Sequence, residues 1–251
     1  MKVYRCQDSL ESIFAAIYCA YEEKCVPEDT CLVLHEEPLL FAEDVWVKAD
    51  CTKVIKVMEA LKQRFGEEDY LFLCLALSSG DEDKAQAVYR TIARGFRGKC
   101  HPGHLFDSLA DDYVLKAFTL ARNAEREVHH LKGFLRFQEL ENGILYAKIG
   151  PVNNVVTFLM PHFADRLPVE DFVIYDDKRN FFAIHPVGKQ WYLLSGENLE
   201  EPELRFSAAE IKYRELFLRF CSSITIQERK NTDLQRNLCP LRFQKYMVEF
   251  S

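Results

Sequence analysis

The sequence predicts an α+β protein in which helices cover a largely antiparallel sheet and the N-terminal lobe is more helical and more acidic. Apolar residues recur at three- and four-residue steps in several segments, which is the spacing of one helix face. Other segments are short apolar runs that flank turn-forming sequences, as strands do in hairpins. With 251 residues, of which 48% are hydrophobic, the chain can also bury a substantial core.

The first hundred residues are expected to open with a strand and to continue mainly as helices. Residues 2–6 have the composition of a short strand, and Asp8 with Glu11 forms a capping-box-like start for the helix that follows. Amphipathic patterns predict further helices at residues 54–65, 68–78 and 82–94. Gly66 is expected to end the first of these three helices.

A lobe boundary is expected near residue 100, where glycine and proline are frequent. Residues 1–100 would form an acidic N-terminal lobe of a strand and helices. Residues 101–251 would form a second lobe with a long helix, β-hairpins and C-terminal helices. The alternative is one compact domain.

The second lobe is expected to begin with a long amphipathic helix from Leu109 to Leu131, which Gly133 ends. Alternating residues from Phe134 onward and the turn sequence Glu141-Asn142-Gly143 predict a hairpin over residues 134–149. Later patterns predict a helix at 152–166, strands at 172–175, 181–184 and 190–194, a helix at 209–224 and a last helix that opens at Pro240.

The charge of the chain is uneven, and this bears on its binding partners. Residues 1–90 hold 10 Lys and Arg against 18 Asp and Glu, which is a net charge of −8. Residues 205–251 hold 9 against 5, which is a net charge of +4. The formal net charge of −7 therefore does not exclude nucleic acid, because a polyanion could bind at the basic end of the chain.

The cysteines predict reduced thiols, since their count of 9 is odd and their spacing fits no disulfide framework. The compact cluster Cys100-His101-x-x-His104 lacks a partner pair, and there is no CxxxCxxC motif, so we predict neither a metal nor a cofactor. No signal peptide and no membrane-spanning stretch is evident. We therefore expect a cytoplasmic protein with no membrane contact.

Several motifs in the second lobe occur in a recognisable order. They are Glu127-x-His129-x-x-Lys132-Gly133-Phe134-x-Arg136-Phe137, His162-Phe163-x-x-Arg166, Ile174-x-Asp176-x-x-Arg179, Ile226-x-x-Arg229-Lys230-Asn231, Leu234-Gln235-Arg236 and Pro240-x-Arg242-Phe243-x-Lys245-x-x-x-Glu249. The chain thereby resembles a bacterial DNA metabolism family linked to radical-SAM proteins, over most of its length and least over 1–100. It departs from the family at Phe243-Gln244, where an aromatic pair is usual, so stacking by a second ring is not expected.

The resemblance implies a role in DNA modification or repair, but it implies no particular reaction. Other members carry a similar domain fused to a uracil-DNA glycosylase, or are encoded beside a radical-SAM protein of DNA modification or repair. The implied partner is thus a radical-SAM DNA modification or repair protein, with uracil-DNA glycosylase activity as a functional associate.

Basic residues of the motifs are candidates for binding DNA phosphates, because guanidinium groups match phosphate oxygens. The candidates are Arg126, Lys132, Arg136, Arg166, Arg179, Arg229, Lys230, Arg236 and Arg242. The alternative is a solvated face with intramolecular ion pairs, such as Glu215 with Arg219 at helical spacing.

Three residues are candidates for catalysis. Glu127 and His129 lie near a helix end, where a carboxylate could act as a base and an imidazole could move protons, and His162 could do the same. The alternative is structural, with the helix dipole favouring His129 and with Glu127 holding Arg136 or Arg166. The chain lacks the GxxxxGK[ST], GxGxxG, GxSxG, HExxH and zinc-deaminase signatures.

The expected function is that of an accessory protein in DNA modification or repair, which binds nucleic acid or a repair enzyme through a basic surface of the second lobe. One alternative is an enzyme that acts on a nucleotide or a DNA lesion. The other is a non-enzymatic adaptor for a radical-SAM protein.

Overall fold

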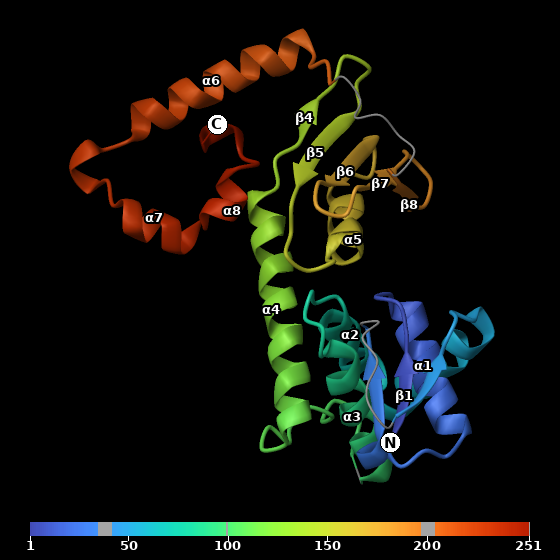
Figure 1. The fold of residues 1–251 in the computed structure, drawn as a ribbon. Helices are drawn as coiled ribbons and strands as arrows, with labels where there is room; N and C mark the ends of the chain where they lie inside the picture. The colour runs from blue at the N-terminus through green and yellow to red at the C-terminus, as the bar shows by residue number, and fades with distance from the viewer. Residues whose placement is uncertain (35–41, 99, 197–203, 251) are drawn as a thin grey trace. The chain divides into compact units, whose positions relative to one another are not determined.

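A computed structural model describes residues 1–34, 42–98, 100–196 and 204–250 (Figure 1). The chain divides into two compact units, Met1–Arg126 and Glu127–Ser251. Each unit contains helices and a sheet, so the α+β prediction is confirmed. The division falls within one helix, α4 (Asp112–Phe134), and a separate lobe over residues 1–100 stays a prediction.

The first unit contains a three-stranded parallel sheet in the order β2-β1-β3. Its strands are β1 (Lys2–Arg5), β2 (Thr30–Val33) and β3 (Glu43–Trp46). Helix α1 (Leu10–Glu22) follows β1, and the Ser9 side chain caps it by accepting the N–H of Ser12. Helix α1 and the short helix η1 (Pro27–Asp29) form the crossover between β1 and β2 that a parallel pair needs. The expected antiparallel arrangement therefore does not describe this sheet.

Two further helices complete the first unit before α4. They are α2 (Cys51–Leu77) and α3 (Lys84–Arg97). The Asp50 carboxylate caps α2, and Gly66 interrupts it with φ 88° and ψ 169°. The helices predicted at 54–65 and 68–78 are thus the two halves of α2, and the predicted break at Gly66 is confirmed. Only glycine adopts this positive φ without strain.

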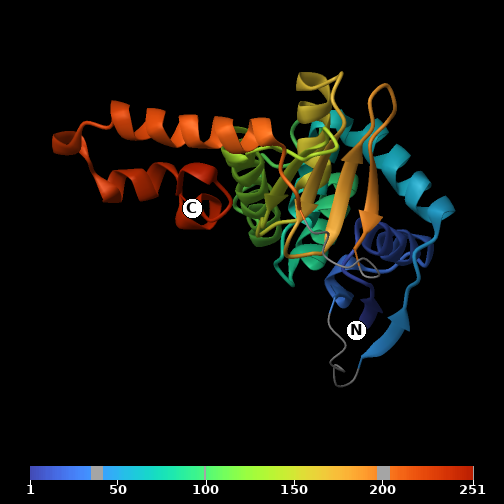
Figure 2. The ribbon, with the colours of Figure 1, turned by 90° about the horizontal axis from the view of Figure 1, so that it is seen from above.

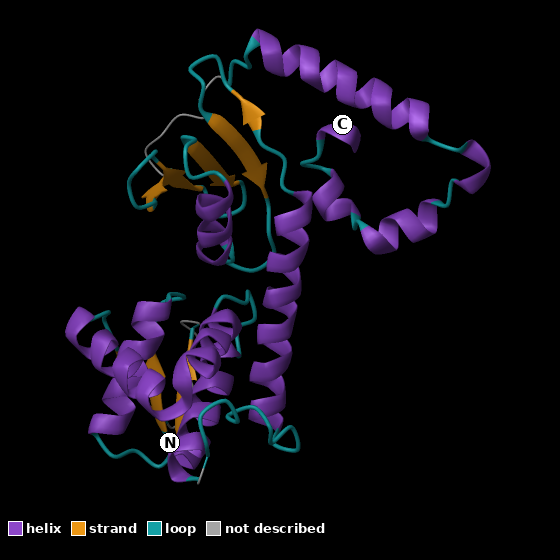
Figure 3. Ribbon diagram, turned by 180° about the vertical axis from the view of Figure 1, so that it is seen from behind, coloured by secondary structure: helices purple, strands orange, loops and turns teal. Residues whose placement is uncertain are grey.

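The second unit contains a five-stranded sheet in the order β4-β5-β6-β7-β8. Its strands are β4 (Gln138–Glu139), β5 (Leu145–Ile149), β6 (Phe172–Asp176), β7 (Phe181–His185) and β8 (Tyr192–Ser195). The β4–β5, β6–β7 and β7–β8 pairs are antiparallel, as predicted, whereas β5 and β6 are parallel. Helix α5 (Val156–Arg166) forms the crossover between these two strands and contacts β7 (Figure 3).

The prediction of a strand from residue 134 is wrong. Helix α4 continues through Gly133 to Phe134, and strand pairing begins at Gln138. Arg136 Nη1 donates hydrogen bonds to the carbonyl oxygens of Gly133 (2.8 Å) and Leu135 (3.3 Å). A cationic side chain at a helix C-terminus satisfies carbonyl groups that have no partner within the helix, and this stabilises the extra turn.

The chain ends in a series of helices. They are α6 (Ala208–Ile224), η2 (Gln227–Arg229), α7 (Thr232–Leu238), α8 (Leu241–Gln244) and η3 (Val248–Phe250). Residues 208–238 are here named the C-terminal arm, and neither α6 nor α7 contains a buried residue. Figure 1 and Figure 2 show α6 and α7 extending away from the five-stranded sheet. Phe243 and Met247, which follow the arm, are buried.

Among the described residues, no helix has both the length and the apolar character that crossing a membrane requires.

Candidate functional site

The loop of residues 150–153, between β5 and α5, is held by a buried carboxylate from α4. Glu127 is 1% exposed, and its Oε1 accepts the N–H of Val152 at 2.9 Å. Its Oε2 accepts both the N–H and the side-chain amide of Asn153 at 2.8 Å. These three hydrogen bonds satisfy a carboxylate that burial would otherwise destabilise. Glu127 thus fastens α4 to the 150–153 loop.

Arg179, in the turn between β6 and β7, holds the same loop from another side. Its guanidinium donates to the carbonyl oxygens of Pro151 (3.2 Å) and Val152 (2.6 Å). It also pairs with the fully buried Asp176 at 3.1 Å. Asp176 in turn accepts the N–H groups of Lys178 and Arg179, which fixes the turn.

The C-terminal tail, here residues 239–250, lies against the start of the 150–153 loop through Tyr246. A Cβ added to Gly150 would overlap the Tyr246 ring, so the two residues are in close contact. The Tyr246 hydroxyl donates to Asp177 at 3.0 Å, and Lys148 pairs with the same carboxylate at 2.8 Å. Burial would raise the pKa of Asp177, but the hydrogen bonds from Lys148 and Tyr246 outweigh it and hold the pKa below its ordinary value.

The tail also contacts the end of α4. Arg136 donates to Glu249 through Nε (3.2 Å) and Nη2 (2.7 Å). The His130, Phe134 and Phe243 rings contact one another: the His130 centroid lies 5.7 Å from Phe134 and 5.6 Å from Phe243, and those two rings are 5.5 Å apart. Burial is the main cause that lowers the pKa of His130. At neutral pH this imidazole is therefore an uncharged part of an aromatic cluster.

Seven of the motif residues that carried the family resemblance are linked around the 150–153 loop and the C-terminal tail, and we name them the buried framework after the buried carboxylates Glu127 and Asp176. Its members are Glu127, Arg136, Asp176, Arg179, Arg242, Phe243 and Glu249. Arg242 joins it through Nη2, which lies 4.0 Å from Glu127 Oε1. Three of the predicted phosphate-binding residues therefore have carboxylate partners within the chain, namely Arg136, Arg179 and Arg242. For these three, the structure agrees with the alternative of intramolecular ion pairs.

The other predicted phosphate-binding residues are exposed. They are Arg126, Lys132, Arg166, Arg229, Lys230 and Arg236. Within the described ranges, none of the six forms an ion pair. Arg126 is the last residue of the first unit, and the other five belong to the second. Cations without a carboxylate partner can take up phosphate without first breaking an ion pair.

Two of these cations lie close to a predicted catalytic histidine. Burial is the first cause that lowers the pKa of His162, and the charges of Lys132 and Arg166 lower it further. Lys132 comes from α4, whereas His162 and Arg166 come from α5. We name these three residues the α4–α5 patch. It is a cationic surface whose imidazole is neutral at pH 7.

The remaining three cations are on the C-terminal arm. Arg229 ends η2, Lys230 follows it, and Arg236 is in α7. The arm also exposes large apolar side chains, among them Tyr213 (67%), Phe220 (57%) and Leu238 (67%). Cationic and apolar groups are therefore both accessible along these helices.

The structure does not join the three predicted catalytic residues. In the part of the chain that is described, no hydrogen bond connects Glu127 with His129 or His162. Both Glu127 oxygens already accept hydrogen bonds from the 150–153 loop, and His129 is exposed. The arrangement supports an anchoring role for Glu127, and its catalytic role stays a prediction.

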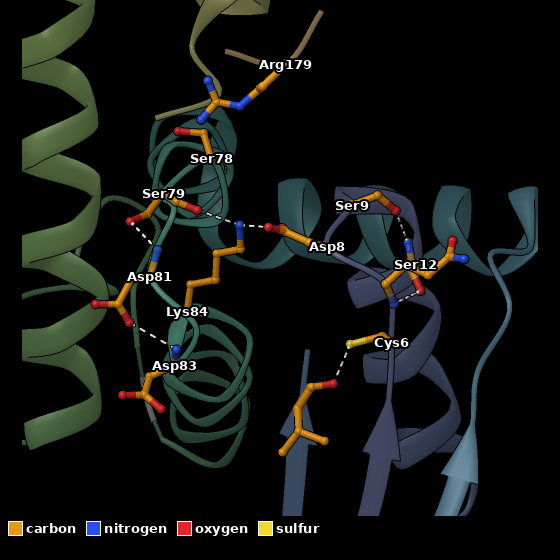
Figure 4. Close-up of polar contacts among 12 residues, drawn as sticks. Cys6, Asp8, Ser9, Ser12, Ser78, Ser79, Asp81, Asp83, Lys84 and Arg179 are labelled. Atoms are coloured by element: carbon orange, nitrogen blue, oxygen red, sulfur yellow. Dashed lines mark hydrogen bonds and ion pairs between the residues drawn. The ribbon is translucent and has the colours of Figure 1, made fainter. Parts of the chain in front are cut away.

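A buried lysine in the first unit was not singled out from the sequence. The Lys84 side chain is 4% exposed, and its Nζ donates to the Ser79 carbonyl and pairs with Asp8 (Figure 4). Nearby, burial is the main cause that raises the pKa of Cys6 to about 12, so the thiol stays protonated. Lys84 ties the β1–α1 loop to the α2–α3 connection. In the sequence it follows Asp81-Glu82-Asp83, which is typical of a solvated surface turn.

The Cys100 cluster has ordinary local contacts. Cys100 Sγ donates to the His101 carbonyl at 3.4 Å, and His104 pairs with Asp107 at 2.7 Å. Over the described residues, no group of three or more His, Cys, Asp or Glu is placed to hold a metal ion.

A family model described as a domain of unknown function, DUF4130, matches residues 82–249. This match includes all residues of the buried framework, the α4–α5 patch and the C-terminal arm. No curated protein matches the chain.

Proposed function

The chain belongs to the DUF4130 family, and we propose that it is an accessory protein in DNA modification or repair that binds nucleic acid through its second unit. The observation that carries this proposal is a set of exposed cations that form no ion pair with any described residue, namely Lys132, Arg166, Arg229, Lys230 and Arg236. The repair context rests on the motif resemblance, which implies a radical-SAM partner and uracil-DNA glycosylase activity as a functional associate.

The contrast with the buried framework supports a binding role for these five cations. Arg136, Arg179 and Arg242 interact with Glu249, Asp176 and Glu127, so phosphate would have to compete with carboxylates already in place. Among the residues that the structure describes, the five exposed cations have no such carboxylate competitor. Most contacts in protein–DNA complexes are to phosphate and sugar, and these contacts position a protein without reading sequence.

The test is a fluorescence-anisotropy titration of the full chain with single- and double-stranded oligonucleotides at several salt concentrations. If four phosphates are neutralised, log affinity should fall against log salt with a slope of about −3 to −4. Affinity should be similar for unrelated sequences. Absence of binding at low salt would rule out direct contact by this chain.

A matched control distinguishes binding by these particular cations from binding that depends only on the net charge of the protein. Lys189 is exposed and belongs to the second unit, but it was not among the predicted binding residues. Lys189→Ala should leave affinity and slope unchanged, whereas Arg229→Ala and Arg236→Ala should each weaken binding. Equal effects of all three substitutions would show that only the overall charge matters.

The adaptor role is the second candidate, and the exposed apolar side chains of the arm favour it. Tyr213, Phe220 and Leu238 are 67%, 57% and 67% exposed. Contiguous patches of exposed apolar side chains mark protein interaction surfaces, whereas single exposed apolar side chains are common on any protein. Binding to a radical-SAM protein should then be lost in Tyr213→Ser and Phe220→Ser and should depend little on salt. Loss in the arginine variants alone would favour nucleic acid.

A further inference from the structure

A groove of about 360 Å³ lies on the first unit beside α3. Arg90, Arg94 and Arg97 line it from one helix, at steps of four and three residues, so they share one face of α3. The η1 helix contributes Glu28, and the start of α4 contributes Tyr113. The volume falls within the range of about 300–1,000 Å³ that is usual for small-molecule sites.

The three arginines are held in different ways. Arg90 Nη1 donates to the Pro27 carbonyl at 2.9 Å, and its guanidinium lies 4.6 Å from the centre of the Tyr113 ring. Arg90 is therefore held in place by an uncharged carbonyl group and an aromatic ring. Arg94 pairs with Asp111 at 2.7 Å, and Arg97 pairs with Glu28 at 2.6 Å.

The groove has an excess of positive charge in an acidic part of the chain. Its three arginines face the two carboxylates of Glu28 and Asp111. By contrast, the first unit, residues 1–126, holds 16 Lys and Arg against 22 Asp and Glu in total. A local reversal of charge inside a concave surface concentrates anions there.

The ion pair between Arg97 and Glu28 is open to exchange. The two side chains are 54% and 55% exposed, and the Arg94 side chain is 51% exposed. Exposed pairs of this kind contribute little to stability. A phosphate carries more charge than a carboxylate and accepts two parallel hydrogen bonds from a guanidinium, so it can displace Glu28.

We propose that this groove binds a small phosphate ester of about nucleoside-monophosphate size. Arg94 and Arg97 hold the phosphate, Glu28 moves aside, and Arg90 on Tyr113 forms a fixed cationic wall. This site is separate from the nucleic-acid surface proposed above, because all of its residues belong to the first unit.

The test is calorimetric titration of the full chain at low salt with uridine 5′-monophosphate, inorganic phosphate and uridine. The two phosphate compounds should bind and uridine should not. Arg94→Ala and Arg97→Ala should each weaken binding by about tenfold or more, since each removes charged hydrogen bonds. Glu28→Gln should strengthen binding by about two- to fivefold, because it removes the competing carboxylate.

Arg122→Ala is the matched control, since Arg122 is also exposed and also pairs with a carboxylate, Glu125, but lies outside the groove. Circular dichroism shows which variants are folded, and the gain in Glu28→Gln cannot arise from unfolding. No heat with either phosphate compound, or equal affinity in the Arg97 and Arg122 variants, would overturn the proposal. Neither result affects the oligonucleotide titration, so the two proposals fail independently.

Discussion

Tyr246 occupies the space that a side chain at position 150 would need. Tyr246 comes from the C-terminal tail, and Gly150 follows β5, so this contact brings two distant parts of the second unit together. The same tail supplies Arg242 and Glu249 to the buried framework. The contact can be tested by adding one methyl group.

Gly150→Ala is expected to lower the free energy of unfolding by about 1–3 kcal/mol, because the new Cβ overlaps the Tyr246 ring and one of them must shift. Gly133→Ala is the control, since a Cβ there meets nothing within 4 Å and alanine favours the helix. Urea denaturation measures both. Equal stability of the two variants would show that the tail does not pack on Gly150.

Glu127→Ala is expected to lower the free energy of unfolding by about 2–4 kcal/mol, because it leaves the N–H of the buried Asn153, and also that of Val152, without its acceptor. Glu125→Ala changes a carboxylate two residues away that is 47% exposed, so the expected change is within about 0.5 kcal/mol. Urea denaturation at pH 7 distinguishes the two. An unchanged stability in Glu127→Ala would remove the anchoring role and reopen the catalytic one.

Arg136 is expected to stabilise the fold, whereas Arg236 is expected to bind nucleic acid. Arg136→Ala breaks two hydrogen bonds to Glu249 and should lower the free energy of unfolding by about 1–2 kcal/mol. Arg236→Ala should leave stability unchanged and reduce the magnitude of the salt slope by about 0.7 to 0.9. Thermal unfolding and anisotropy on the same two variants provide the comparison. The reverse pattern would contradict the division into framework and binding residues.

His162 gives an expected dependence on pH. Burial first, and then Lys132 and Arg166, lower its pKa from the ordinary value of 6.5. The unfolded chain therefore takes up a proton before the folded chain does as the pH falls. Above pH 6.5 His162 is uncharged in both states and does not oppose folding. As the pH falls below 6.5 toward the folded pKa of His162, proton uptake by the unfolded chain lowers the stability of the fold. Urea denaturation between pH 5 and 7.5 should show the loss, and His162→Asn should flatten it.

The same histidine tests whether nucleic acid binds at the α4–α5 patch. A bound phosphate would offset the charges of Lys132 and Arg166, so the pKa of His162 should rise on binding. NMR titration of the His162 ring protons, with and without an oligonucleotide, measures this rise. An unchanged His162 pKa in a saturated complex would place the nucleic acid elsewhere.

Local patterns predicted the fold well where neighbouring residues decide it. The β6–β7 hairpin followed from two apolar runs around a polar turn, and the break at Gly66 followed from the properties of glycine. The strand expected at residue 134 failed because α4 continues through Gly133 to Phe134 and strand pairing begins only at Gln138. Arg136 stabilises this longer helix by donating to the carbonyl of Gly133.

Contacts between distant residues could not be predicted from patterns. The parallel pairing of β5 with β6 depends on where α5 places the chain, and no local signal encodes it. The sequence did indicate that Glu127 could be structural, but its partners Val152 and Asn153 are visible only in the folded chain. Lys84 was missed for the same reason, because its burial depends on the distant Asp8.

The C-terminal arm is attached at both of its ends, and this has a consequence for amide hydrogen exchange. At one end, the Ser207 N–H donates to the Glu139 carbonyl at 3.0 Å, and at the other the Phe243 ring is buried against His130. Since α6 and α7 bury no side chain, they can open to solvent while the sheet stays closed. Deuterium should therefore enter the arm through local opening, at rates that destabilising the sheet leaves unchanged.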